Sequence, residues 1–187
     1  MNQSVVISIV VVVILFFILK VKDSYVMMKS SIDNRLYRVK KNKLSEQSAN
    51  LLAVINKRLL ALIEFSSNKS PEPYYKKNLE RYNEHSISEN ILDLDTTYTL
   101  NKGDSMVFCL SPRDEDTLSL YDINTMMFVA VHELAHVASN SIGHTEEFKR
   151  NFKDLLEDAI TIGLYEFVDY SKKPVEYCGI TINSTVI

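Results

Sequence analysis

The sequence has few of the residues that mark several common classes of small protein. Only two of its 187 residues are cysteine, Cys109 and Cys178, and they lie 69 positions apart. This spacing excludes a disulfide framework and a CxxC metal or redox pair. The default interpretation is two reduced thiols that pack as small apolar side chains, and a single disulfide stays open. Internal repeats and low-complexity tracts are also absent, so we expect one globular domain with an appendage.

Positive charge is scarce after residue 43. From residue 44 onward 13 basic residues meet 22 acidic ones, which gives this part of the chain a net charge of −9. The stretch from Lys20 to Lys43 carries +6 instead. An acidic domain without a second zinc module is a poor match to the phosphate backbone, so no nucleic-acid partner is expected.

The N-terminus lacks the marks of a cleaved signal peptide. Val5 to Leu19 is an apolar run of fifteen residues in which Ser8 is the only polar one, with no basic residue before it and no small-residue cleavage pattern after it. We therefore expect residues 1–22 to be an uncleaved transmembrane helix, because lysines that follow the run can extend its reach by snorkelling. The basic connector, residues 23–44, would then lie at the cytosolic membrane surface, with the rest of the chain in the cytosol.

Apolar periodicity and turn residues predict an α+β domain over residues 45–187. The expected elements are helices at 45–65, 74–82, 124–139 and 145–162, a hairpin of strands at 96–100 and 105–110, and a last strand within 178–187. Asp122 or Asn124 is the expected N-cap of the third helix.

Residues 131–148 read VHELAHVASNSIGHTEEF and contain the strongest chemical signal. His132 and His136 are four residues apart, so a helix presents both imidazoles on one face to a shared Zn²⁺. Glu133 lies about 100° around the helix and is placed to act as the general base toward water in the open coordination position. The surrounding helix is apolar almost all the way round, and a buried cation would offset the cost of burying these polar groups. The alternative is a buried histidine pair whose partners are backbone carbonyls.

His144 is the expected third ligand. It follows the short segment SNSIG, in which Gly143 lets the chain turn back, and three of the four histidines then fall within thirteen residues. Glu157, 21 residues after His136, is the alternative ligand. A metzincin is excluded, because the position three beyond His136 is Ser139 rather than glycine.

HELAH followed by GHTEEF resembles the WLM and SprT-like zinc peptidases, whose pattern is HExxH, a spacer, a histidine and, four positions later, an aromatic residue. The resemblance implies a zincin-like fold, with an active-site helix on a short β-sheet. It also implies that His132, His136 and His144 bind zinc, that Glu133 is the catalytic acid/base and that Phe148 packs against the site. The DNA-repair role of those families is not carried over, because DNA-binding elements are missing.

After the N-terminal apolar run, the chain contains in order the motifs YRVKKNK, LLAVINKRL, YTLNKG, FCL, HELAHVAS, GHTEEF, IGLY, VDYS and YCG. This order is similar to that of metallopeptidase-like membrane proteins of large nucleocytoplasmic DNA viruses, which implies a viral membrane or virion location. We expect a membrane-anchored zinc metallopeptidase that hydrolyses a polypeptide substrate lying along the edge of the hairpin at 96–110. The alternative is a non-catalytic membrane or virion component with a structural zinc site. A second catalytic group could come from Tyr165, Tyr170 or Tyr177, although aromatic residues at such positions are more often core. His85 lies in a polar segment and is expected to be solvated.

Overall fold

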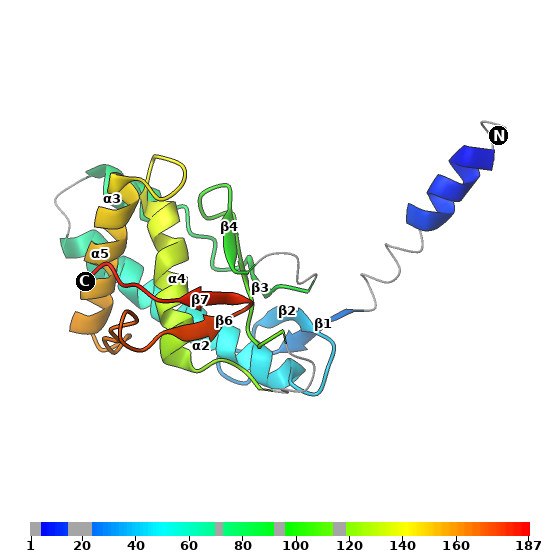
Figure 1. Cartoon of the computed structure of the whole chain (residues 1–187), viewed down its shortest axis with the longest axis horizontal. Coiled ribbons are helices and arrows are strands. Elements are labelled where there is room, and N and C mark those ends of the chain that lie inside the picture. Colours follow the sequence, from blue (N-terminus) through cyan, green and yellow to red (C-terminus); the bar gives the residue numbers. More distant parts are fainter. Residues whose placement is uncertain (1–4, 15–23, 70–72, 92–95, 114–118) are drawn as a thin grey trace.

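A computed structural model of the chain describes residues 5–14, 24–69, 73–91, 96–113 and 119–187. These residues form an α+β domain with a five-stranded sheet, a second sheet of two strands and helices packed against them (Figure 1). The elements follow in the order β1 (Tyr25–Lys29), β2 (Leu36–Lys40), α2 (Ser45–Lys69), α3 (Pro73–Leu79), β3 (Ile87–Glu89), β4 (Tyr98–Leu100), β5 (Ser105–Phe108), α4 (Ile123–Ala138), α5 (Glu146–Thr161), β6 (Val175–Tyr177) and β7 (Ile180–Ile182).

The five-stranded sheet is mixed, with the order β1-β2-β3-β5-β4. Its two outer pairs, β1 with β2 and β4 with β5, are antiparallel, and β3 is parallel to both of its neighbours. The turn Asn101–Gly103 joins β4 to β5 with three successive positive φ angles of 46°, 59° and 113°. Asn and Gly tolerate this conformation, so the predicted hairpin forms, and β4 becomes an edge strand of the sheet.

Two long helices, α2 and α4, supply a large part of the core. Helix α2 buries a stripe at helical spacing that includes Leu52, Ile55 and Leu59, and it contacts the sheet as well as α4 and α5. Helix α4 is buried on nearly all sides, because it is packed between α2, α3, α5 and β4. Polar side chains on α4 are therefore held in the interior beside the edge strand.

The structure differs from the predicted elements in the segments before and after α2. Residues 25–29 and 36–40, within the predicted connector, pair as β1 and β2, and Tyr37 and Val39 of β2 are buried. Strand β3 has only three residues, all buried, so it shows no alternation that a sequence pattern could reveal.

The prediction of a transmembrane helix at residues 1–22 was wrong. Residues 5–14 are helical, and no helix in the described parts of the chain is long and apolar enough to cross a membrane. Residues 1–4 and 15–22 of the predicted span lie outside the described residues. The membrane assignment, and the single-pass topology with a cytosolic domain that depended on it, are corrected accordingly.

A disulfide joins Cys109, directly after β5, to Cys178 in the turn between β6 and β7. This pairing replaces the default interpretation of two reduced thiols. The Tyr177 hydroxyl donates a hydrogen bond of 2.8 Å to the carbonyl of Cys109, and the Tyr121 hydroxyl accepts one of 2.8 Å from the Cys178 N–H. The β6–β7 hairpin, residues 175–182, is thus fixed to the main sheet at its turn.

Candidate metal centre

Helix α4 places two histidines and a glutamate at the floor of a cavity. Asp122 caps the helix by accepting hydrogen bonds from the N–H groups of Asn124 and Thr125, as predicted. The rings of His132 and His136 lie one helical turn apart, with their centroids 5.1 Å from each other. Both side chains are half-buried and reach the cavity.

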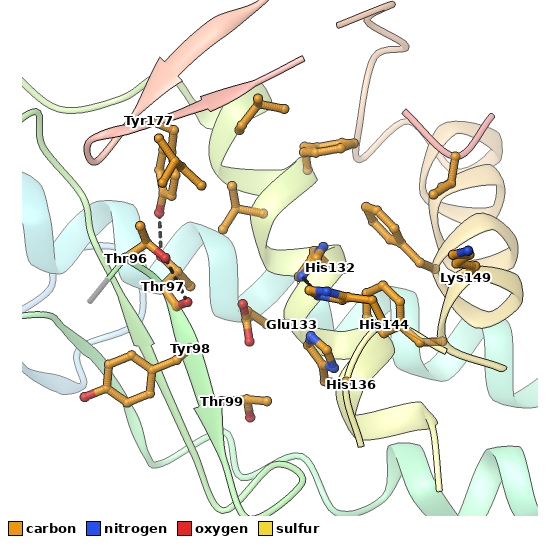
Figure 2. Close-up of a pocket in the computed structure, with 18 of the residues that line it drawn as sticks. Thr96, Thr97, Tyr98, Thr99, His132, Glu133, His136, His144, Lys149 and Tyr177 are labelled. Atoms are coloured by element: carbon orange, nitrogen blue, oxygen red, sulfur yellow. Dashed lines mark hydrogen bonds between the residues drawn. The ribbon is translucent and has the colours of Figure 1, made fainter. Parts of the chain in front are cut away.

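His144 returns to the same point from the segment between α4 and α5. Helix α4 ends at Ala138 with Ser139 as its C-cap, and Gly143 turns the chain with a φ of 81° in open space. The Nε2 atoms of His144 and His132 lie 3.1 Å apart, and one ligand nitrogen from each of the three histidines lies within 4.8 Å of the others. Figure 2 shows the three rings pointing toward one another. The structure thus contains a histidine cluster that could hold a metal ion.

The spacing of the three donors fits a metal ion in tetrahedral coordination. Two nitrogens bound to one tetrahedral zinc lie about 3.3 Å apart, close to the separation seen between His132 and His144. A hydrogen bond between two neutral imidazoles would explain that pair alone, and it would give no reason for the third ring, His136, to converge on the same place. Three protein ligands also leave one coordination position for a water or a substrate.

Burial keeps the α4 imidazoles in the form that binds metals. Desolvation, followed by the effect of the neighbouring histidines, lowers the pKa of His132 to about 3. The pKa of His136 falls to about 4 for the same first reason, with smaller contributions from His144 and Lys102. Both rings are therefore neutral at physiological pH, and a neutral imidazole has a free nitrogen lone pair for a metal.

Glu133 lies on the side of the cluster that faces β4 (Figure 2). Its side chain is 6% exposed, and this burial raises the pKa of the carboxyl to about 7, while a hydrogen bond from the backbone of Thr99 acts in the opposite direction. A carboxyl group with a pKa near neutrality can both accept and release a proton. Glu133 thus has the chemistry that a general acid/base needs, directly beside the histidines.

Two charged side chains fix the segment that carries His144. Lys102, in the β4–β5 turn, donates hydrogen bonds to the carbonyl of His136 at 3.2 Å and to the carbonyl of Ser141. Glu147, in the first turn of α5, accepts bonds of 2.9 Å from the N–H groups of Asn140 and Ser141. The segment is therefore held from both sides, which restricts the position of the His144 ring.

Phe148 packs against the cluster and makes no polar contact with it. Its ring centroid lies 4.3 Å from that of His136, 4.7 Å from that of His144 and 4.9 Å from that of His132. The side chain is buried, so it orients the imidazoles by contact, in agreement with the packing role expected from the resemblance.

The cluster opens into a cavity of about 880 Å³. One side is formed by residues 96–99 before and along β4, and the other by α4, α5 and the segment with His144. The β6–β7 hairpin and the C-terminal residues 184–186 complete the wall. The sequence did not predict that the C-terminal segment reaches this cavity. The contacts that hold it there, the Cys109–Cys178 disulfide and the hydrogen bonds of Tyr121 and Tyr177, join residues that are far apart in the sequence.

The other residues singled out in the sequence lie away from the cluster. Glu157, the alternative ligand, is half-exposed on α5 with its carboxylate 3.5 Å from the Lys153 ammonium, and it is not part of the histidine group. The hydroxyl of Tyr177 contacts Thr97 and the carbonyl of Cys109, so it is engaged in the core. Tyr165 and Tyr170 are buried against Phe128, behind the cavity wall. His85 is exposed, as expected.

No protein-family model matches the chain, and no solved structure matches it. The zincin-like part of the fold prediction is therefore corrected to α+β alone. The chain is 35% identical over 186 residues to the uncharacterized protein R325 of Acanthamoeba polyphaga mimivirus, covering 95% of this chain and 92% of that protein. It is also 40% identical over 106 residues to the uncharacterized protein 042R of Invertebrate iridescent virus 3, and 37% identical over 70 residues to 136R of Invertebrate iridescent virus 6. These matches cover 54% and 37% of this chain, and 62% and 39% of the two relatives.

Proposed function

The chain belongs to the family of uncharacterized viral proteins that includes R325 of Acanthamoeba polyphaga mimivirus, and we propose that it is a zinc-dependent peptidase. The observation that carries the proposal is the convergence of three histidine nitrogens within 4.8 Å at the floor of a cavity, with the Glu133 carboxyl beside them. The resemblance of HELAH and GHTEEF to the WLM and SprT-like peptidases supports the same activity.

In the proposed reaction, the bound metal and Glu133 have different roles. When bound by His132, His136 and His144, zinc supplies a Lewis acid that polarises a carbonyl and lowers the pKa of water. The carboxylate of Glu133 takes the proton from the attacking water and then delivers it to the nitrogen of the leaving amine. Because Glu133 is buried and receives a hydrogen bond from the backbone of Thr99, its carboxyl group is held in place for both transfers.

Strand β4 gives an extended polypeptide a place to bind. It is an edge strand of the five-stranded sheet, paired with β5 on one side only, and residues 96–99 line the cavity. A substrate that adds to such an edge forms main-chain hydrogen bonds independently of its side chains. The scissile carbonyl would then lie between β4 and the histidines.

Metal analysis and proteolysis with the full chain test the proposal. We expect one zinc per chain in the wild type and in Glu133→Gln, since Glu133 is not a ligand. Cleavage of a peptide library should fall by about 100-fold or more in Glu133→Gln, the range seen when a general acid/base is removed. Glu157→Gln, which removes a half-exposed carboxylate on α5, is the matched control and should cleave at the wild-type rate.

Equal cleavage by wild type and Glu133→Gln would refute the role of Glu133. Stoichiometric zinc without any cleavage that depends on Glu133 would favour a structural metal site in a non-catalytic viral protein.

A further inference from the structure

One end of the cavity is apolar, and it begins at the metal cluster itself. The ring of His132 lies 5.2 Å from that of Phe152 on α5, and Phe152 lies 5.3 Å from Phe128 in an edge-on contact. Phe128 and Val129 precede His132 by one turn of α4 and line the same cavity. A continuous apolar wall therefore runs from a proposed metal ligand into the cavity.

The C-terminal segment forms the facing wall. Ile180, Ile182 and Val186 line the cavity, and Ile180 is 50% exposed. The disulfide at Cys178 fixes the hairpin that carries the two isoleucines. A fixed hairpin keeps the width of the cavity constant, which a pocket needs if it is to select side chains by size.

The charged side chains that line the cavity, Lys102, Glu133 and Lys149, have partners of their own. Lys102 is held by carbonyls of α4 and the following segment, and Glu133 faces β4. Lys149, on α5, is paired with Glu146 at 2.7 Å. A charged substrate group between Phe128, Phe152 and the C-terminal isoleucines would lose water without gaining an ionic partner there, whereas an apolar group would cover surface that is exposed in the free protein.

We propose that this end of the cavity binds the side chain of a bulky apolar residue, of the size of leucine, methionine or phenylalanine, that flanks the scissile bond. The inference rests on the proposed function, because the metal and β4 define where the scissile bond lies. A pocket of this kind discriminates by about tenfold or more for each methylene or two that it buries. The substrates of this protein are thus polypeptides with a large hydrophobic residue next to the cleaved bond.

Binding of peptide hydroxamates to the zinc-loaded full chain tests the proposal without requiring turnover. The probes are three short peptides whose hydroxamate group binds the metal and whose neighbouring side chain is that of leucine, alanine or aspartate. We expect the leucine probe to bind about tenfold or more tightly than the alanine probe, and the aspartate probe to bind most weakly.

Two variants in the C-terminal wall should change this order. Ile180→Asp alters a half-exposed side chain and is expected to fold, and Ile182→Asp is the second variant at the same wall. Each should bring the leucine-to-alanine ratio close to one. Leu36→Asp, at a 61% exposed residue of β2 outside the cavity, is the matched control and should keep the wild-type ratio.

The outcomes separate this inference from the proposed function. Equal binding of the leucine and alanine probes, or a ratio that both C-terminal variants leave unchanged, would overturn the apolar pocket even if the protein cleaves peptides. A leucine preference in a protein that shows no Glu133-dependent cleavage would support the pocket and refute the peptidase. The failure of all three probes to bind the zinc-loaded protein would overturn both.

Discussion

The three histidines occupy unequal positions. His132 and His136 are half-buried on a rigid helix, whereas His144 is exposed on the segment that follows it. The helical pair has a spacing fixed by helix geometry, so the third ring decides whether a complete ligand set forms. On the proposed function, metal binding at this cluster should therefore depend strongly on His144, although its side chain is exposed.

His144→Ala should weaken zinc binding by more than about 100-fold. Removing only the hydrogen-bond partner of a metal ligand already weakens metal binding by up to about 100-fold, and removing the ligand itself should cost more. Competition with a chromophoric chelator measures this affinity. Removal of a ligand leaves His132 and His136 without the third donor, while the buried core, which His144 does not enter, keeps the fold.

His85→Ala is the control for this experiment, because His85 is exposed and lies outside the cluster. It should bind zinc as the wild type does. Similar affinities for His144→Ala and His85→Ala would contradict the three-histidine site.

At the scale of residues, the sequence identified the cluster but not its supports. The spacing of His132 and His136 follows from the helix period, and Gly143 made the return of His144 predictable. Lys102 gave no such signal, because its partners are backbone carbonyls of α4 and of the next segment, which only the folded chain brings to it. The sequence likewise could not predict the hydrogen bond from the Thr99 backbone to Glu133, because every residue except proline has an N–H and none is distinguished by it.

At the scale of elements, the junction between α4 and α5 is held by the first turn of α5. Hydrogen bonds from the Asn140 N–H and then from Ser141 lower the pKa of Glu147 to about 2. A carboxylate with a lowered pKa stabilises the fold when it is ionised, so its contribution is full above its ordinary value of 4.5 and disappears as the pH falls through about 2.

Glu147→Gln should therefore melt at a lower temperature than the wild type at pH 7, and the difference should shrink below pH 4.5 and vanish near pH 2. Thermal melts of the metal-free proteins across this range measure it. Glu146→Gln, one residue earlier and paired only with Lys149 at the surface, is the matched control. If the difference in melting temperature between Glu147→Gln and the wild type stayed constant down to pH 2, the negative charge of Glu147 would not be what holds the junction between α4 and α5.

The β4–β5 turn is a second element whose packing matters to the site. A Cβ at Gly103 would lie 2.8 Å from the carbonyl oxygen of Arg81 and 3.1 Å from a methyl group of Val137, at a φ of 113°. Gly103→Ala should therefore lower the free energy of unfolding by more than the roughly 1–2 kcal/mol that a left-handed alanine costs by itself. Urea denaturation measures the change.

Gly163→Ala is the matched control, because Gly163 also has a positive φ of 70° but has open space around it. The alanine at Gly103 should destabilise the protein more than the alanine at Gly163. Equal effects would mean that the turn can move away from Arg81, and that the position of Lys102 is less restricted than the structure shows.

The sequence predicted the long helices from their apolar period, and the β4–β5 hairpin from β-prone runs on both sides of a turn that contains Asn and Gly. It missed β1 and β2, a short hairpin within the basic stretch that was taken for a connector, and β3, whose three residues pair with β2 across about 50 positions of sequence. The apolar run after Val5 predicted a membrane span, which no helix in the described parts of the chain provides.

At the scale of the whole molecule, the Cys109–Cys178 disulfide encloses both α4 and α5 and all three histidines. It ties the C-terminal hairpin to the main sheet across a sequence separation of 69 residues. A link of this kind stabilises a fold by about 2–4 kcal/mol, mainly by restricting the unfolded chain. The sequence left this pairing open, because spacing does not say whether two cysteines meet in space.

Reduction of the metal-free protein should lower its melting temperature, since about 2–4 kcal/mol of stability would be lost. The double variant Cys109→Ser with Cys178→Ser should melt near the reduced wild type and should not respond to the reductant. Identical melts of the wild type with and without reductant would show that the link does not contribute to stability in solution.

The same covalent link governs how the protein should be prepared. Bacterial cytoplasm keeps thiols reduced, so recombinant material made there would lack the disulfide, and its carboxyl-terminal residues would not be covalently held to the main sheet. On the proposed function and the proposed apolar pocket, such a sample should bind zinc as the oxidised protein does but discriminate poorly among peptides. Secretion through an oxidising compartment, or oxidation followed by a thiol assay, is therefore the step on which a meaningful substrate profile depends.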